Sequence, residues 1–140
     1  MLTWKAVNPL VAVGAGIAAF LLGGVYWSIV ARFLPAMGAL PVSGLAVGLV
    51  TRILIAYGLA VILAMAAAKG PLAGASAGAL AWLVFVATVL LAEAMFGQVS
   101  WTQVLAGAPE SLLGYSVMGA IVGTWALPAS RPASAASTPA

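Results

Sequence analysis

Side chains that could do chemistry are scarce in this 140-residue sequence. Seven are formally charged, namely five lysines or arginines and the two glutamates Glu93 and Glu110, and the chain contains no histidine and no cysteine. Metal sites of the histidine and cysteine type, nucleophiles activated by histidine, and thiol redox motifs all need the missing residues. The sequence therefore predicts a protein with no enzymatic activity, no metal and no cofactor.

Four of the charges fall within or beside apolar stretches, and they are Arg32, Arg52, Glu93 and Glu110. Ionisable residues inside a membrane segment usually face a bundle interior or a water-filled path. If the stretches around Arg52 and Glu93 are adjacent antiparallel helices, these two side chains reach similar heights and can pair near the outer boundary. The four charges are thus candidates for a polar vestibule; the alternative is an ion pair that only fixes helix packing.

The elements that must position these residues follow from the composition, which is 65% hydrophobic and only 5% charged. Such a chain cannot cover its surface with polar groups, so most of that surface must face lipid. Stretches of about 20 apolar residues span a bilayer as helices. The sequence predicts an all-α antiparallel bundle of four transmembrane helices in residues 1–127, at about 9–31, 43–68, 72–96 and 111–127, and a disordered Ala/Ser/Pro tail over 128–140.

The start of the fourth helix is placed at Pro109-Glu110-Ser111, because proline favours a first helical turn and an acid suits the positive end of the helix dipole. Residues 99–109 before it are expected to form a polar loop.

Small residues recur at a spacing of four, which places them on one helix face and lets backbones approach closely. These candidate packing faces contain Gly14, Gly44, Gly48, Gly70, Gly74, Gly78, Gly119 and Gly123. They can pack within one chain or between chains. Two aromatic residues far from the predicted helix ends, Tyr57 and Trp82, are candidates for lining a cavity or for packing with a local hydrogen bond.

The orientation follows from the lysines and arginines near the helix ends. With four spans, Lys5, Lys69 and Arg131 share one side, and the other side has Arg32 alone or Arg32 and Arg52, depending on whether Arg52 is counted. The positive-inside rule then places both termini in the cytoplasm. The cations are scattered singly, so the sequence offers no patch for nucleic acid.

Several short motifs resemble a family of small four-helix bacterial membrane proteins that is catalogued only as a domain of unknown function. The likeness covers residues 6–127, and it rests on Gly24-Val25-Tyr26-Trp27-Ser28, Trp82 to Thr88, Tyr115, Met118-Gly119-Ala120-Ile121 and Trp125. The resemblance implies a multi-pass protein of the bacterial inner membrane, and it brings no activity, substrate or cofactor.

Three functions remain open from the sequence. The first is an accessory or structural subunit that packs against other membrane subunits or a second copy of itself, with membrane lipid as its surroundings. The second is a small homo-oligomeric transporter or channel that uses the region of Arg52 and Glu93. The third is binding of a lipid, quinone or pigment.

Overall fold

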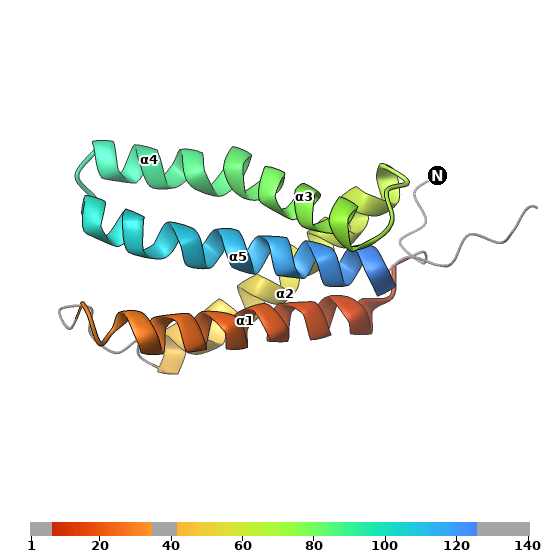
Figure 1. The fold of residues 1–140 in the computed structure, drawn as a ribbon, viewed down its shortest axis with the longest axis horizontal. Coiled ribbons are helices and arrows are strands. Elements are labelled where there is room, and N and C mark those ends of the chain that lie inside the picture. The colour runs from red at the N-terminus through yellow and green to blue at the C-terminus, as the bar shows by residue number, and fades with distance from the viewer. Residues whose placement is uncertain (1–6, 35–41, 126–140) are drawn as a thin grey trace, which may run out of the picture.

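The computed structural model of this chain describes residues 7–34 and 42–125. Four long helices make up these ranges, which contain no strand: α1 (Pro9–Val30), α2 (Val42–Met65), a third helix built from α3 (Pro71–Ala81), η2 (Trp82–Ala87) and α4 (Thr88–Met95), and α5 (Trp101–Trp125) (Figure 1). Each is long and apolar enough to cross a membrane. The predicted all-α four-helix membrane protein is confirmed, while the predicted tail over 128–140 lies outside the described residues.

The helix ends follow local sequence signals. Asn8 caps α1, because its side-chain oxygen accepts a hydrogen bond from the backbone N–H of Leu10, and Pro9 occupies the first turn, where no N–H is needed. The third helix also begins on a proline, Pro71, directly after Gly70, whose φ of 99° suits glycine. These starts agree with the predicted spans to within one residue.

The predicted start of the fourth helix at residue 111 is wrong, because α5 begins ten residues earlier, at Trp101. Ser100 and Gln103 form a capping box: the backbone N–H of Ser100 donates to Gln103 Oε1, and the backbone N–H of Gln103 donates to Ser100 Oγ. Pro109 therefore lies inside the helix, which membrane helices tolerate when other groups satisfy the freed backbone.

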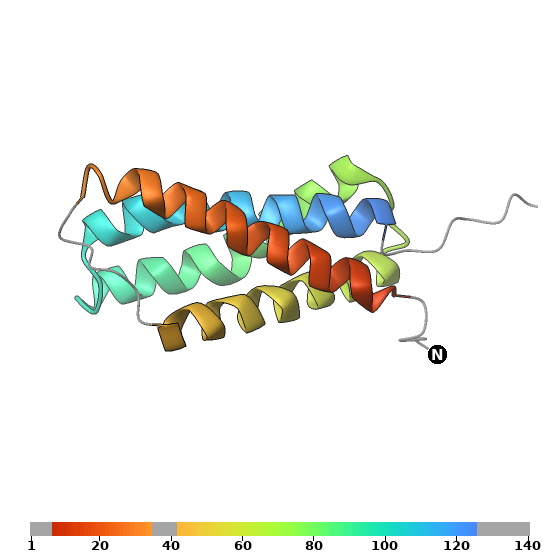
Figure 2. The same cartoon turned by 90° about the horizontal axis from the view of Figure 1, so that it is seen from below.

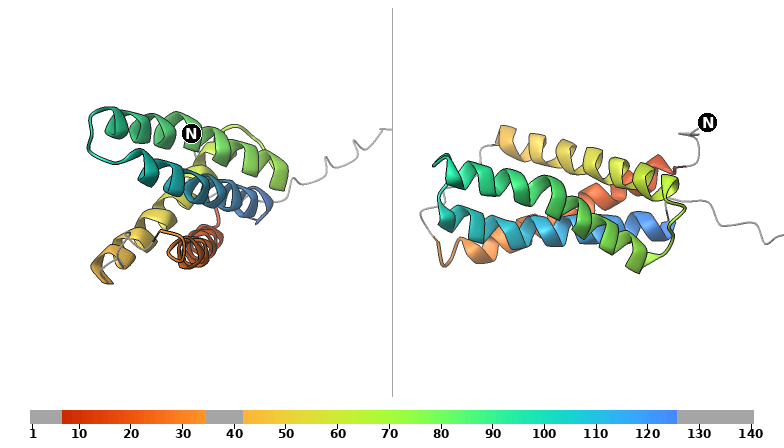
Figure 3. Two further views of the ribbon diagram at one scale, coloured as in Figure 1. Left: turned by 60° about the vertical axis from the view of Figure 1, so that its left-hand side comes forward. Right: turned by 90° about the horizontal axis from the view of Figure 1, so that it is seen from above.

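Helix α5 is central to the arrangement, since it packs against α1, against α2 and along the whole third helix. Figure 1 shows α1 and the third helix on different sides of α5, and Figure 2 shows α2 inclined at an angle to α1. The first half of α2 diverges from the other helices, which is clearest in the left view of Figure 3. Consecutive helices run in opposite directions, so the start of α1, the turn before α3 and the end of α5 lie at one end of the bundle.

The apolar core fills the half of the bundle nearest to that end. Its buried members come from α1, α2 and α5 and include Ala12, Ala15, Ala19, Ala56, Leu59, Ala60, Leu63, Met118 and Val122. Most are small, so the three helices approach closely. A Cβ added at Gly16 of α1 would lie 2.7 Å from the Cα of Ile53 in α2.

The predicted glycine row on the third helix packs within the chain. A Cβ at Gly74 would collide with the carbonyl oxygen of Gly119, and one at Gly78 would collide with that of Tyr115. At the end of this contact, the backbone N–H of Gly70 donates to the Gly123 carbonyl at 2.9 Å. The α3–α5 contact is therefore one of backbone against backbone, as expected where small residues face each other in lipid.

Candidate functional site

The charged centre of the structure is an ion pair between Arg52 of α2 and Glu110 of α5, joined through Arg52 Nη2 and Glu110 Oε1. Arg52 lies ten residues into its helix, and Glu110 lies nine residues into α5 from the same end of the bundle. At about 1.5 Å per residue, both sit about 14–15 Å along their helices, well inside a hydrocarbon core of about 30 Å. At this depth the pair lies inside the membrane. It is also largely buried, since the Glu110 side chain is only 8% exposed.

Two glycines make room for this pair. A Cβ at Gly23 of α1 would collide with Glu110 Oε1, and a Cβ at Gly114 of α5 would collide with Arg52 Nη1. Both glycines are buried. The charges can therefore lie between the helices only because these two positions have no side chain.

Replacing Gly23 with alanine should destabilise the protein by about 1–2 kcal/mol, because the new methyl group displaces the Glu110 carboxylate from Arg52. The neighbouring Gly24 is the matched control, since a Cβ there meets nothing within 4 Å. Gly24→Ala should be neutral or stabilising by about 0.5–1 kcal/mol, as alanine favours a helix. Equilibrium unfolding in mixed micelles measures both variants, and equal stabilities would contradict the position of the carboxylate.

Two further hydrogen bonds connect α5 to its neighbours at the same level as the ion pair. Tyr26 of α1 donates its hydroxyl to the Ala106 carbonyl at 2.7 Å, and Trp82 of the third helix donates its indole N–H to Ser111 Oγ at 2.8 Å. We call Tyr26, Arg52, Trp82, Glu110 and Ser111 the polar layer. Three different helices thus bind a single stretch of α5, residues 106–111.

The polar layer surrounds the irregular part of α5. Pro109 has no N–H and cannot donate to the carbonyl four residues before it. The carbonyls of the next three residues accept side-chain donors: the Tyr26 hydroxyl donates to Ala106, and the Ser111 hydroxyl donates to Gly107 and Ala108 at 3.0 and 3.1 Å. On the facing helix, Trp82 opens the π-helical segment η2. Such segments are rare and often lie at functional sites.

Tyr26→Phe should lower the free energy of unfolding by about 1 kcal/mol, because it removes an interhelical hydrogen bond in a medium that offers no replacement donor. Thr124→Val is the control, since among the described residues the exposed Thr124 hydroxyl bonds only to the Ala120 carbonyl of its own helix. Chemical unfolding of both variants checks the difference. If Tyr26→Phe behaves like Thr124→Val, the Tyr26 hydroxyl contributes nothing to the contact between α1 and α5.

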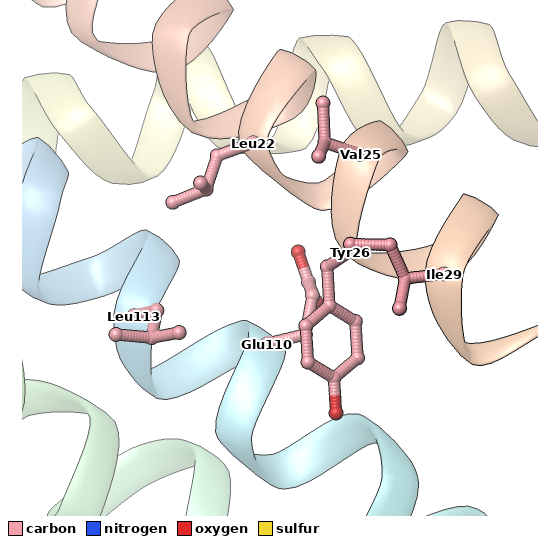
Figure 4. A pocket seen from close by; sticks show the side chains of 6 residues that line it. All are labelled: Leu22, Val25, Tyr26, Ile29, Glu110 and Leu113. Carbon is pink, nitrogen blue, oxygen red and sulfur yellow. The ribbon is translucent and has the colours of Figure 1, made fainter.

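A pocket of about 180 Å³ opens between α1 and α5 beside the polar layer. Figure 4 shows its lining: Leu22, Val25, Tyr26 and Ile29 of α1, and Glu110 and Leu113 of α5. The Glu110 carboxylate points toward α1, and the Tyr26 hydroxyl points toward α5. The pocket is therefore apolar apart from one carboxylate and one phenol oxygen.

The four charges predicted to form a vestibule do not gather. Arg52 pairs with Glu110 and not with Glu93, which lies half-buried near the end of α4. Arg32 is exposed in the turn after α1. No ion pair involving Glu93 or Arg32 occurs within the described ranges. The difference arises because α5 begins at Trp101, which moves Glu110 from an expected helix start to the interior of the bundle.

The predicted cavity aromatics lie elsewhere. Tyr57 is half-buried and packs against the apolar core, and Trp82 is bonded to Ser111. Neither lines the pocket, whose aromatic residue is Tyr26.

The predicted glycine faces divide into two groups. Gly70, Gly74, Gly78, Gly119 and Gly123 meet within the chain. Gly14 is exposed and a Cβ there meets nothing within 4 Å, Gly48 makes an ordinary contact with Phe20, and Gly44 is half-buried.

Sequence reasoning missed Gly16, Gly23 and Gly114 as close-contact positions, and it missed the pairing of Glu110. The sequence signal that could have revealed them is the capping box at Ser100 and Gln103. A helix that begins there contains Glu110 in its interior, with Gly114 one turn further along the same face.

The site contains one carboxylate and one guanidinium that neutralise each other, and three or more potential metal ligands do not cluster anywhere in residues 7–34 and 42–125. The neighbouring hydroxyl and indole groups have backbone or side-chain partners. Comparisons with protein-family models, curated proteins and solved structures found no match to this chain. The resemblance to the four-helix bacterial family therefore stays a prediction.

Proposed function

We propose that this chain is a non-enzymatic membrane protein of the bacterial inner membrane, an accessory or structural subunit that works by packing against other membrane subunits or a second copy of itself. The observation that carries the proposal is the exposure of the third helix. Of its residues Pro71–Met95, only Gly74, Gly78 and Ala94 are buried, and all three belong to segments that pack against α5. Nearly the whole outer surface of this helix is available to another transmembrane helix.

The polar layer supports a structural role. Its charges are paired, and its hydroxyl and indole groups tie α1 and the third helix to α5. The polar groups thus bind the chain's own helices to one another. Large apolar side chains lie on the outer surface of the bundle, among them Leu80, Leu83 and Phe85, which are 58–65% exposed. In lipid, association of such surfaces depends on close van der Waals packing.

Native mass spectrometry of the tagged protein, extracted in lipid nanodiscs from its host, tests the proposal by reading stoichiometry and co-purifying subunits together. We expect a fixed ratio to larger membrane subunits or a defined homo-oligomer. We expect Phe85→Ala to weaken this assembly. Leu21→Ala is the matched control, because Leu21 is 61% exposed but lies on α1. A monomer without partners, or equal effects of the two variants, would argue against the role of the third helix.

The proposal includes an orientation with both termini in the cytoplasm. Lys69 lies at the same end of the bundle as the start of α1 and the end of α5, and Arg32 lies at the opposite end. Reporter fusions should give a fluorescent C-terminal green fluorescent protein and an inactive C-terminal alkaline phosphatase. The opposite pattern would reverse the orientation without changing the fold.

A further inference from the structure

The pocket between α1 and α5 presents only hydrogen-bond acceptors to an occupant. Glu110 Oε1 accepts from Arg52, and the described residues supply no donor to Oε2. Every fully buried side-chain oxygen and nitrogen in the described ranges has a hydrogen-bond partner. Oε2 has none within these ranges, so it must be accessible from outside, and Glu110 lines the pocket. The other polar group, the Tyr26 hydroxyl, has already donated its proton to Ala106. A polar occupant that matches these two groups must therefore bring a donor.

The charge balance favours a neutral donor over a cation. Arg52 and Glu110 together carry no net charge. A bound ammonium group would leave one positive charge uncompensated in a region of low dielectric, which is costly. A hydroxyl group donates to the carboxylate without adding charge.

The size of the pocket and its apolar walls indicate what the occupant looks like beyond its donor group. The pocket is half-open, and its volume of about 180 Å³ leaves room for one aromatic ring, since an enclosed cavity of ~150 Å³ holds benzene. The wall residues Leu22, Val25, Ile29 and Leu113 are 37–58% exposed on the lipid-facing surface. An occupant can thus enter from the bilayer with one aromatic ring between α1 and α5 (Figure 4).

We propose that this pocket binds the head group of a lipid-soluble phenol, with the phenolic hydroxyl donating to Glu110 Oε2 and the ring against Leu22, Val25 and Leu113. An oxidised quinone has only acceptor oxygens, so it faces the Glu110 carboxylate without a donor. The site therefore selects hydroxyl-bearing aromatic molecules from the membrane. This binding is separate from the packing role of the third helix.

The test uses fluorine NMR of 4-fluorophenol, 4-fluoroanisole and 4-fluorobenzylammonium with the full chain in nanodiscs, and subtracts the line broadening of empty nanodiscs. We expect 4-fluorophenol to bind at least about tenfold more tightly than 4-fluoroanisole, because the methyl ether cannot donate. Val25→Trp, which fills the pocket from an exposed position, should abolish the excess broadening. Val13→Trp, on an exposed position of α1 outside the pocket, should not.

Each other result overturns the proposal. Equal binding of the phenol and its ether would mean that the donor is not recognised, and tighter binding of the ammonium probe would make the pocket a cation site. Excess broadening that survives in Val25→Trp would place the phenol elsewhere, and no excess broadening in the wild type would leave the pocket to lipid chains. Thermal unfolding of both tryptophan variants at the wild-type temperature establishes that the fold is retained.

Discussion

Gly78→Ala should lower the free energy of unfolding by about 3 kcal/mol, and Gly74→Ala should have a similar effect. The added Cβ meets backbone atoms of α5 in both cases, the carbonyl groups of Tyr115 and Gly119. A side chain can rotate away from an intruding methyl group, but a helix backbone cannot, so the two helices must separate along their contact. Loss of this contact removes the main neighbour of α3.

Gly58→Ala is the matched control, because Gly58 lies inside α2, is exposed and has nothing within 4 Å of an added Cβ. It should be neutral or slightly stabilising. Equilibrium unfolding in mixed micelles of sodium dodecyl sulfate and a mild detergent gives the free energies. If Gly78→Ala instead dissolves an oligomer and leaves the monomer as stable as the wild type, the glycine row packs between chains and not within one.

The second large effect is expected at the ion pair. Glu110→Leu leaves the Arg52 guanidinium without a counter-charge inside the membrane, which should cost about 3–5 kcal/mol. Arg52→Leu should cost less, because a carboxyl group can take up a proton and become neutral, whereas a guanidinium keeps its charge. The double variant with leucine at both positions should recover most of the loss, since it buries no charge.

A double-mutant cycle from the same unfolding measurements isolates the coupling between the two side chains. Arg32→Leu and Glu93→Leu serve as controls, because neither residue has an ion-pair partner within the described ranges. Both should stay within about 0.5 kcal/mol of the wild type. Strong coupling of Arg52 to Glu93, with none to Glu110, would refute the pairing seen in the structure.

The glycine contacts also change how an assembly experiment must be designed. From the sequence, bulky substitutions at Gly74 or Gly78 would test association with partners, because the row could lie at an interface between chains. In the structure these positions are inside the α3–α5 contact, so such variants would unfold the subunit before they reported on its partners. Exposed residues of the third helix, such as Phe85, are the informative positions.

The sequence alone determined the class of protein, the number of spans and most helix ends. Composition decides whether a surface faces lipid, because the cost of exposing apolar groups to water depends on residue type and not on their arrangement. Pro9 and Pro71 mark helix starts locally, so α1 and the third helix were predicted to within a residue. Pro109 does not mark a helix start, because proline is typical of a first helical turn but is also tolerated inside a membrane helix.

Tertiary structure alone decided which charges meet and where a pocket forms. A run of apolar residues around a membrane helix does not specify which face turns inward, because lipid solvates every face about equally well. That rotation is set by close backbone contacts, such as Gly74 against Gly119 and Gly16 against Ile53. Once these contacts orient the helices, Arg52 reaches Glu110 and not Glu93, and the carboxylate comes to line a pocket between α1 and α5.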